Sequence, residues 1–143
     1  MARTDRTKSI DPSRADSYAE LGRRLMDGAD LILELGEPGH ASALAILSIH
    51  AVIAFSDAAT IHRAGRKSRS ADHEAGLTVL SAAFGSALPA SVVKAIRKVV
   101  SEKSRFEYQG YVATMAEGRA VYDQAKKVRA WVEAVLVTTR RSH

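Results

Sequence analysis

Apolar positions along the chain recur with the spacing of a helix face, and no segment alternates over the length of a strand. Glycine and proline interrupt this pattern at short joints, as is typical of helix ends. The helices predicted in this way cover about residues 11–35, 40–62, 71–88, 89–108 and 111–139. Because short joints place consecutive helices side by side and antiparallel, we predict an all-α fold, a single up-and-down bundle of about five helices.

The predicted helices differ in the apolar surface that they offer to the core. The first begins at an Asp11-Pro12 cap, and the second is rich in small residues, with seven alanines between Ala41 and Ala59. Such a helix lets neighbouring backbones approach closely, so we expect it to be the central helix. Gly118 is expected to weaken the last helix without breaking it. The predicted core stripes are Tyr18, Leu21, Leu25, Ile32 and Leu35 with Ala29 and Leu33 beside them, then Leu77, Leu80, Ala83 and Phe84, then Val92, Val93, Ile96, Val99 and Val100, and finally Met115, Tyr122, Ala125, Val128, Val132, Val135 and Leu136 with Trp131 close by.

The 143 residues fit one domain with two short flanking segments. Residues 1–10 contain Arg3, Arg6 and Lys8 and almost no apolar side chains, which predicts a mobile basic arm. Residues 11–139 form the predicted helical domain, and residues 140–143 are expected to fray.

Composition excludes several classes of function. The chain has no cysteine, so thiol chemistry and cysteine-bound metal are excluded, and a reducing compartment is expected. The longest apolar run, Ala51–Phe55, is far shorter than a bilayer span, and the basic N-terminus lacks the features of a signal peptide. We therefore expect a soluble cytoplasmic protein without a membrane partner. No phosphate loop, metalloprotease helix or nucleophile elbow is present, and the five histidines lack ligand spacing, so no cofactor or metal is expected.

A basic segment follows the second predicted helix. The formal net charge of +5 and the pI of about 9.7 favour polyanionic partners. Four cations, Arg63, Arg66, Lys67 and Arg69, precede Asp72 and His73, where the third helix is predicted to begin. The free N–H groups and partial positive charge of a helix start add to such cations, which predicts a phosphate-binding site. The alternative is a solvated basic turn without a ligand.

Two polar residues interrupt the apolar second helix. His50 and Asp57 are seven residues apart, close to two full turns, so both are expected on the same face. One interpretation is a satisfied polar network inside the bundle that reaches Arg105 and Tyr108 on the fourth helix. The other is that this cluster lines a pocket and is a second candidate site.

Several of these residues together resemble the HEPN superfamily of small helical domains. The pattern consists of His50-Ala-Val-Ile-Ala-x-x-Asp57-Ala, a basic turn, Asp72-His73 at a helix start, and Arg105-x-x-Tyr108-x-Gly110 before a long final helix with Ala120 and Tyr122. The resemblance covers about Ala41 to Leu136, which is most of the chain.

The resemblance implies a helical bundle that forms a homodimer. Many members are metal-independent endoribonucleases of toxin–antitoxin systems, with an arginine and a histidine as the active motif, and other branches bind nucleic acid, nucleotides or protein partners. Arg66 and His73 match that motif at the outer limit of its spacing. His73 would take the 2′-hydroxyl proton and Arg66 would stabilise the charged phosphate. The alternative is that His73 only caps the third helix.

Three functional hypotheses follow from the sequence. The first is a HEPN-like module that binds RNA, a nucleotide or another phosphate-bearing ligand through the basic turn. The second is a metal-independent endoribonuclease with an antitoxin partner. The third is a dimeric protein-interaction module without catalytic activity.

Overall fold

The computed structural model describes residues 7–69 and 73–140. Within these residues the predicted all-α fold is confirmed, because five α-helices form a bundle. They are α1 (Ala15–Leu35), α2 (Ala41–Ala64), α3 (His73–Phe84), α4 (Ala90–Tyr108) and α5 (Met115–Arg140). Single 3-10 turns lie at Pro12–Arg14, Pro38–His40 and Gly85–Ala87, and two short strands, β1 (Thr7–Ser9) and β2 (Arg66–Ser68), form a small sheet.

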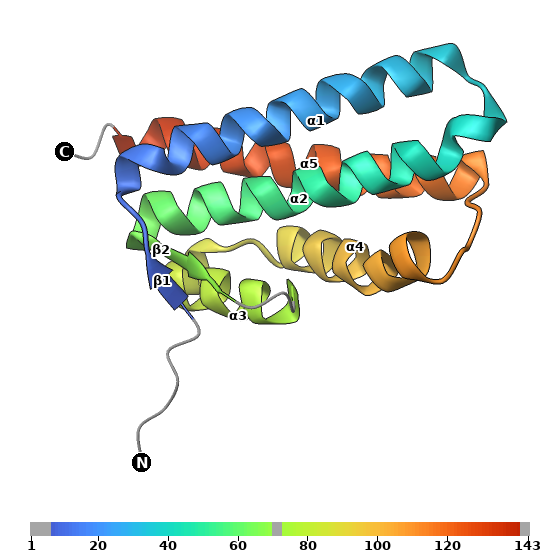
Figure 1. Cartoon of the computed structure of the whole chain (residues 1–143). Helices are drawn as coiled ribbons and strands as arrows, with labels where there is room; N and C mark the ends of the chain where they lie inside the picture. The colour runs from blue at the N-terminus through green and yellow to red at the C-terminus, as the bar shows by residue number, and fades with distance from the viewer. Residues whose placement is uncertain (1–6, 70–72, 141–143) are drawn as a thin grey trace.

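Helix α2 is the central helix, as its alanine content predicts. It contacts α1, α3, α4 and α5, and Figure 1 shows it running through the middle of the molecule with α1 and α4 on opposite sides. The chain runs in opposite directions along α1 and α2, and again along α4 and α5 (Figure 1). The buried residues of α2 lie on all sides of the helix, as is typical of a helix in the middle of a core.

The core face of α1 matches the predicted stripe only in part. Tyr18, Leu25 and Ile32 pack against the core, but Leu21 and Leu35 are 53% and 66% exposed, and the fully buried residues are mostly small. Gly22 explains this orientation, since a Cβ there would lie 2.9 Å from the ring of Phe55 on α2. The small stripe brings the two helices close enough for Phe55 to pack against the α1 backbone. The buried residues of α1 are Ala15, Ala19, Gly22, Met26 and Ala29.

Helix α5 packs against α2 at a glycine as well. A Cβ on Gly118 would lie 2.8 Å from the carbonyl oxygen of Ala41, so this position requires glycine for close approach. The predicted stripes of the last three helices are confirmed. The buried residues of these stripes are Leu77, Leu80, Phe84, Val92, Ile96, Val99, Tyr122, Ala125, Val128, Val132 and Leu136. The others are partly buried and pack against the core, namely Ala83, Val93, Val100, Met115, Trp131 and Val135.

The helix ends follow the predicted signals with small differences. Asp11 accepts a hydrogen bond from the Ser13 N–H at 2.9 Å and caps a 3-10 turn, after which α1 begins at Ala15. Gly36 ends α1 and Gly65 ends α2, and both adopt left-handed conformations with φ of 66°. Helix α3 ends at Phe84 rather than near residue 88, because Gly85 starts a 3-10 turn there.

The N-terminal segment is more ordered than the predicted mobile arm. Thr7–Ser9 pair with β2, and Ile10 is buried with its N–H donating to the Gly65 carbonyl at 2.9 Å. Strands of three residues are too short to give an alternating pattern, which is why the sequence did not predict them. The predictions for residues 1–6 and 141–143 lie outside the described residues, and Arg140 is the last residue of α5.

One segment of the described chain, Pro38–Ala64, is long and apolar enough to cross a membrane by length and composition. Its most apolar window is 67% buried inside the bundle. That degree of burial is typical of a core helix.

Candidate functional site

The predicted basic turn is a short strand held in place by the end of α2. Gly65 closes the helix, its N–H donating to the Ile61 carbonyl at 2.8 Å, while its own carbonyl accepts from Ile10. The chain then continues into β2, whose Ser68 is buried. The two strands are antiparallel, with Thr7 opposite Ser68 and Ser9 opposite Arg66. We call β1 and β2 together with Arg63 and Arg69 the basic ribbon.

The strand pairing places Lys8 of the N-terminal segment beside the basic turn. Lys8 lies directly opposite Lys67, so both side chains project from the same face of the ribbon. Lys67 is partly buried and lies 3.7 Å from Asp57 on α2, measured from Nζ to Oδ2, and 6.0 Å from the centre of the Tyr18 ring. Asp57 therefore offsets the repulsion between the two lysines.

The arginines of the basic ribbon face solvent. Arg63, Arg66 and Arg69 are exposed, and the Arg63 guanidinium lies 5.1 Å from the centre of the Phe84 ring. Within residues 7–69 and 73–140 no ion pair is found for Arg66 or Arg69. The chain thus presents exposed guanidinium groups at one end of the bundle, where β1 and β2 lie in Figure 1.

The structure leaves the Arg66–His73 hypothesis open. The backbone of His73 begins α3, and α3 packs against β2, the strand that carries Arg66. The His73 side chain and all of Asp72 lie outside the described residues. The pairing of these groups therefore stays a prediction.

Asp57 is the partly buried acid of this region, with 21% of its side chain exposed. Burial raises the pKa of its carboxyl to about 6, against the opposing effect of Lys67, which favours the charged form. Beside it lies a cavity of about 20 Å³, enough for a single water molecule, lined by residues of α2, α3 and α4. Ser56 lines the same cavity, and its buried hydroxyl has no partner among the described residues.

His50 lies in a different environment from Asp57. It is 47% exposed, and its Nε2 contacts the Glu107 carboxylate of α4 at 2.5 Å. Lys103 donates to the same carboxylate at 2.5 Å and to the Tyr108 hydroxyl at 3.0 Å. His50 and Tyr108 thus belong to one network, as predicted, but Glu107 and Lys103 join them.

Asp57 and Arg105 do not belong to that network. Seven residues of helix span roughly 10 Å, so His50 and Asp57 contact different neighbours although they share a face. Arg105 binds Glu102 at 2.6 Å and Glu117 at 3.4 Å, on the side of α4 that faces α5. The single cluster predicted from the four residues is therefore three separate groups of contacts.

Glu117 organises the start of α5 and was not among the predicted site residues. Its carboxylate accepts from the Thr114 N–H at 2.9 Å and from the Tyr111 hydroxyl at 2.7 Å, while the Thr114 hydroxyl accepts from the Glu117 N–H at 3.2 Å. This is a capping box, and the Thr114-x-x-Glu117 spacing could have predicted it. These hydrogen bonds hold the pKa of Glu117 below its usual value.

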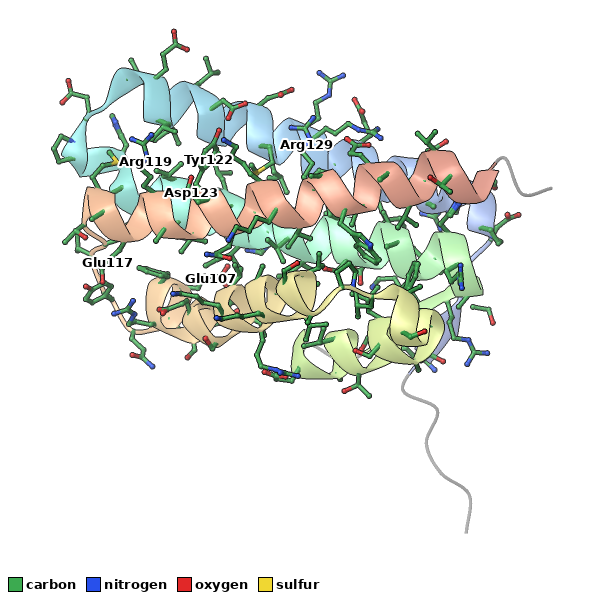
Figure 2. The ribbon with its side chains drawn as sticks, turned by 180° about the vertical axis from the view of Figure 1, so that it is seen from behind. Glu107, Glu117, Arg119, Tyr122, Asp123 and Arg129 are labelled. Atoms are coloured by element: carbon green, nitrogen blue, oxygen red, sulfur yellow. The ribbon has the colours of Figure 1, made fainter. Side chains whose placement is uncertain are left out.

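A cavity of about 210 Å³ lies between α4 and α5. Figure 2 shows Glu117 at the start of α5, while Tyr122 lies on the side of that helix that faces α1. The Arg105 guanidinium lies 4.8 Å from the Phe106 ring centre and 4.7 Å from that of Tyr111, which fixes it at the cavity. The lining residues are Lys98, Val99, Glu102, Arg105, Phe106, Glu117, Ala120, Val121 and Gln124.

Across residues 7–69 and 73–140, no group of three or more histidine and acidic side chains lies close enough to hold a metal ion. The comparisons with known proteins give no further assignment. No family model, no curated protein and no solved structure matches the chain. The resemblance to the HEPN superfamily therefore stays a prediction.

Proposed function

We propose that the protein binds RNA or a related phosphate polymer through the basic ribbon. The observation that carries this proposal is the pairing of β1 with β2, which adds Lys8 to the cations of the basic turn. Arginine donates two parallel hydrogen bonds to a phosphate, and the exposed Arg66 and Arg69 leave their guanidinium groups accessible. Lys67 stays paired with Asp57, so its role is to hold the ribbon against α2.

The electrostatics of the chain support the same proposal. Cations that neutralise phosphates release condensed counterions, so the affinity for RNA should fall steeply as the salt concentration rises. The net charge of +5 adds a long-range attraction for any polyanion. A ribbon of fixed backbone geometry presents its cations with less loss of freedom on binding than an unpaired arm.

Fluorescence anisotropy with a labelled single-stranded RNA tests the proposal. We expect the variant with Lys8→Gln, Arg66→Gln and Arg69→Gln to bind more weakly and to lose roughly 0.7 from the logarithmic salt slope for each lost phosphate contact. The matched control replaces Lys94, Lys126 and Lys127 by glutamine, which removes the same charge elsewhere. Equal weakening by both variants would show that net charge, rather than the ribbon, determines binding.

The same RNA tests the endoribonuclease hypothesis. If Arg66 and His73 catalyse cleavage, the native chain should cut the RNA in the presence of EDTA, and His73→Ala should abolish cleavage while the binding affinity is kept. Cleavage that persists in His73→Ala would remove this residue from the mechanism. An intact RNA that still binds would leave the protein as a binding module.

A second candidate function, self-association as an interaction module, is favoured by the leucines that α1 leaves exposed. Leu21, Leu31 and Leu35 are 53%, 64% and 66% exposed and fall on one side of the helix. We propose that a second copy covers these leucines, because a two-fold axis places the same exposed apolar side chains of two copies against each other. Light scattering should show a dimer that Leu31→Glu with Leu35→Glu converts to a monomer. The control Val137→Glu, at another exposed apolar site, should stay dimeric.

A further inference from the structure

We propose that the cavity between α4 and α5 binds a small zwitterion, an α-amino acid with a branched aliphatic side chain. This site is separate from the basic ribbon and does not depend on RNA binding. The proposal follows from the polar groups that the cavity leaves without partners, from its balance of charge, and from its size and apolar floor.

The cavity contains open hydrogen-bond donors. Both Nη atoms of Arg105 contact carboxylates, but its Nε is buried and has no partner among the described residues. The Lys98 side chain, on the preceding turns of α4, also has no ion pair within residues 7–69 and 73–140. A buried N–H without an acceptor is costly, so the Arg105 Nε points to a ligand that brings a carboxylate. The exposed Lys98 lies at the same cavity as a second cation for that carboxylate.

The cavity also contains an open acceptor. Glu102 contacts Arg105 through Oε2, and its other oxygen has no partner in the described part of the chain. Glu117, by contrast, is engaged by Thr114, Tyr111 and Arg105. The free oxygen of Glu102 therefore favours a ligand with an ammonium group, which donates charge-assisted hydrogen bonds to a carboxylate.

The charges of the lining residues cancel. Lys98 and Arg105 are cations, and Glu102 and Glu117 are carboxylates, so the cavity has both signs of charge and no net charge. A ligand with the same property keeps every charge paired, whereas a phosphate would bring excess negative charge next to two carboxylates. This balance favours an amino acid over a nucleotide.

The size and floor of the cavity limit the side chain of the ligand. An apolar cavity of about 150 Å³ accommodates benzene, so a cavity of about 210 Å³ accommodates a molecule the size of valine, leucine or isoleucine. The floor consists of the buried Val99, Phe106 and Val121, which suit an aliphatic side chain.

An NMR titration of the full chain with L-valine, L-leucine and L-isoleucine tests the proposal. We expect saturable shifts of backbone amides confined to residues 98–106 of α4 and 117–124 of α5. Calorimetry with 3-methylbutanoate, which lacks the ammonium, and with isobutylamine, which lacks the carboxylate, should each show at least about tenfold weaker binding than valine.

Two variants locate the site without replacing Arg105, whose contact with Glu117 at the start of α5 is kept. Glu102→Gln should weaken valine binding at least about tenfold and leave 3-methylbutanoate binding unchanged. Ala120→Leu should block all three amino acids, because it fills the cavity from an exposed helix position. Lys126→Gln is the matched control and should bind valine like the native chain.

The proposal is overturned by valine binding that survives Ala120→Leu, by 3-methylbutanoate that binds as tightly as valine, or by the absence of saturable shifts with all three amino acids. Saturable shifts at α4 and α5 with guanosine and not with amino acids would overturn it in favour of a nucleobase. RNA binding by the basic ribbon is measured with the separate ribbon variant, so either proposal can fail while the other stands.

Discussion

The two flanks of the central helix α2 hold their neighbours by different means. On the flank that faces α1 and α5, glycines let the backbones come close together. A Cβ on Gly118 would lie 2.8 Å from the Ala41 carbonyl oxygen, and one on Gly22 would lie 2.9 Å from the Phe55 ring. This flank has no room for an added methyl group unless a neighbour moves.

The flank that faces α3, α4 and β2 adds polar pairs to its apolar contacts. Asp57 pairs with Lys67 of β2, and His50 pairs with Glu107 of α4. A cavity of about 20 Å³ lies beside Asp57, and the buried Ser56 hydroxyl next to it has no partner among the described residues. Close backbone approach thus distinguishes one flank and titratable side chains the other, so they should respond to different perturbations.

The largest effect is expected from Gly118→Ala on the closely packed flank. Replacing a helical glycine by alanine ordinarily gains about 1 kcal/mol, but here the new Cβ meets a backbone oxygen that has no rotamer to change. Overpacking of this kind costs about 3 kcal/mol, so we expect a net loss of about 2 kcal/mol in the free energy of unfolding, measured in urea.

Gly76 of α3 is the matched control for this substitution. A Cβ there would have no atom within 4 Å, so Gly76→Ala should stabilise the protein by up to about 1 kcal/mol. Gains of equal size in both variants would contradict the close approach of α5 to α2.

A smaller loss is expected from Gly22→Ala, because a side chain rather than a backbone atom opposes the new methyl group. Phe55 is fully buried, so its ring can shift only by disturbing its own neighbours, and the net loss should be about 1 kcal/mol. A double-mutant cycle with Phe55→Leu measures the contact directly. The smaller leucine should remove most of the penalty, and additive effects of the two changes would contradict the contact.

The contrast between the flanks also explains which parts of the fold could be predicted. The stripes of α3, α4 and α5 were predictable because large apolar residues occupy their buried faces. On α1 the prediction was only partly correct, because Tyr18, Leu25 and Ile32 pack against the core whereas Leu21 and Leu35 are exposed. The buried stripe there consists mostly of alanine and glycine, which gives a weak hydrophobic pattern although it allows the closest packing.

The candidate site was predictable only where the residues are neighbours in sequence. The basic turn, Gly65 as a helix end and the position of Asp57 on α2 follow from local pattern. Lys8 joins the site through a strand pair between segments far apart in sequence. Each strand has only three residues, which is too short to give a recognisable strand pattern in the sequence. Glu107, which contacts His50, and Lys103, which donates to Glu107, likewise come from a helix more than fifty residues away in sequence.

On the polar flank, the pH dependence of stability should reveal Asp57. Burial raises its pKa from the ordinary 3.8 to about 6 in the folded chain, so the folded chain binds this proton more tightly than the unfolded chain does. The tighter binding of this proton therefore stabilises the folded chain at low pH, and this contribution to the free energy of unfolding is lost as the pH rises through about 6. Lowering the pH from 7 to 5 should stabilise the native chain by about 1 kcal/mol relative to Asp57→Asn.

Urea unfolding of both proteins at the two pH values measures this difference. Other titrating groups contribute equally to the native chain and to Asp57→Asn, so their effects cancel in the comparison. Identical pH dependence in the two proteins would show that the Asp57 carboxyl is not buried in solution.

The smallest effect is expected from His50→Ala, although His50 and Asp57 share a face of α2. His50 is 47% exposed, and an exposed ion pair contributes little to stability, so the loss at pH 7 should not exceed about 0.5 kcal/mol. Glu107→Gln should cost more, because the Glu107 side chain is only 10% exposed and Lys103 loses its partner as well. Urea unfolding distinguishes the two variants. A larger loss from His50→Ala than from Glu107→Gln would show that His50 contributes to stability through contacts other than the one with Glu107.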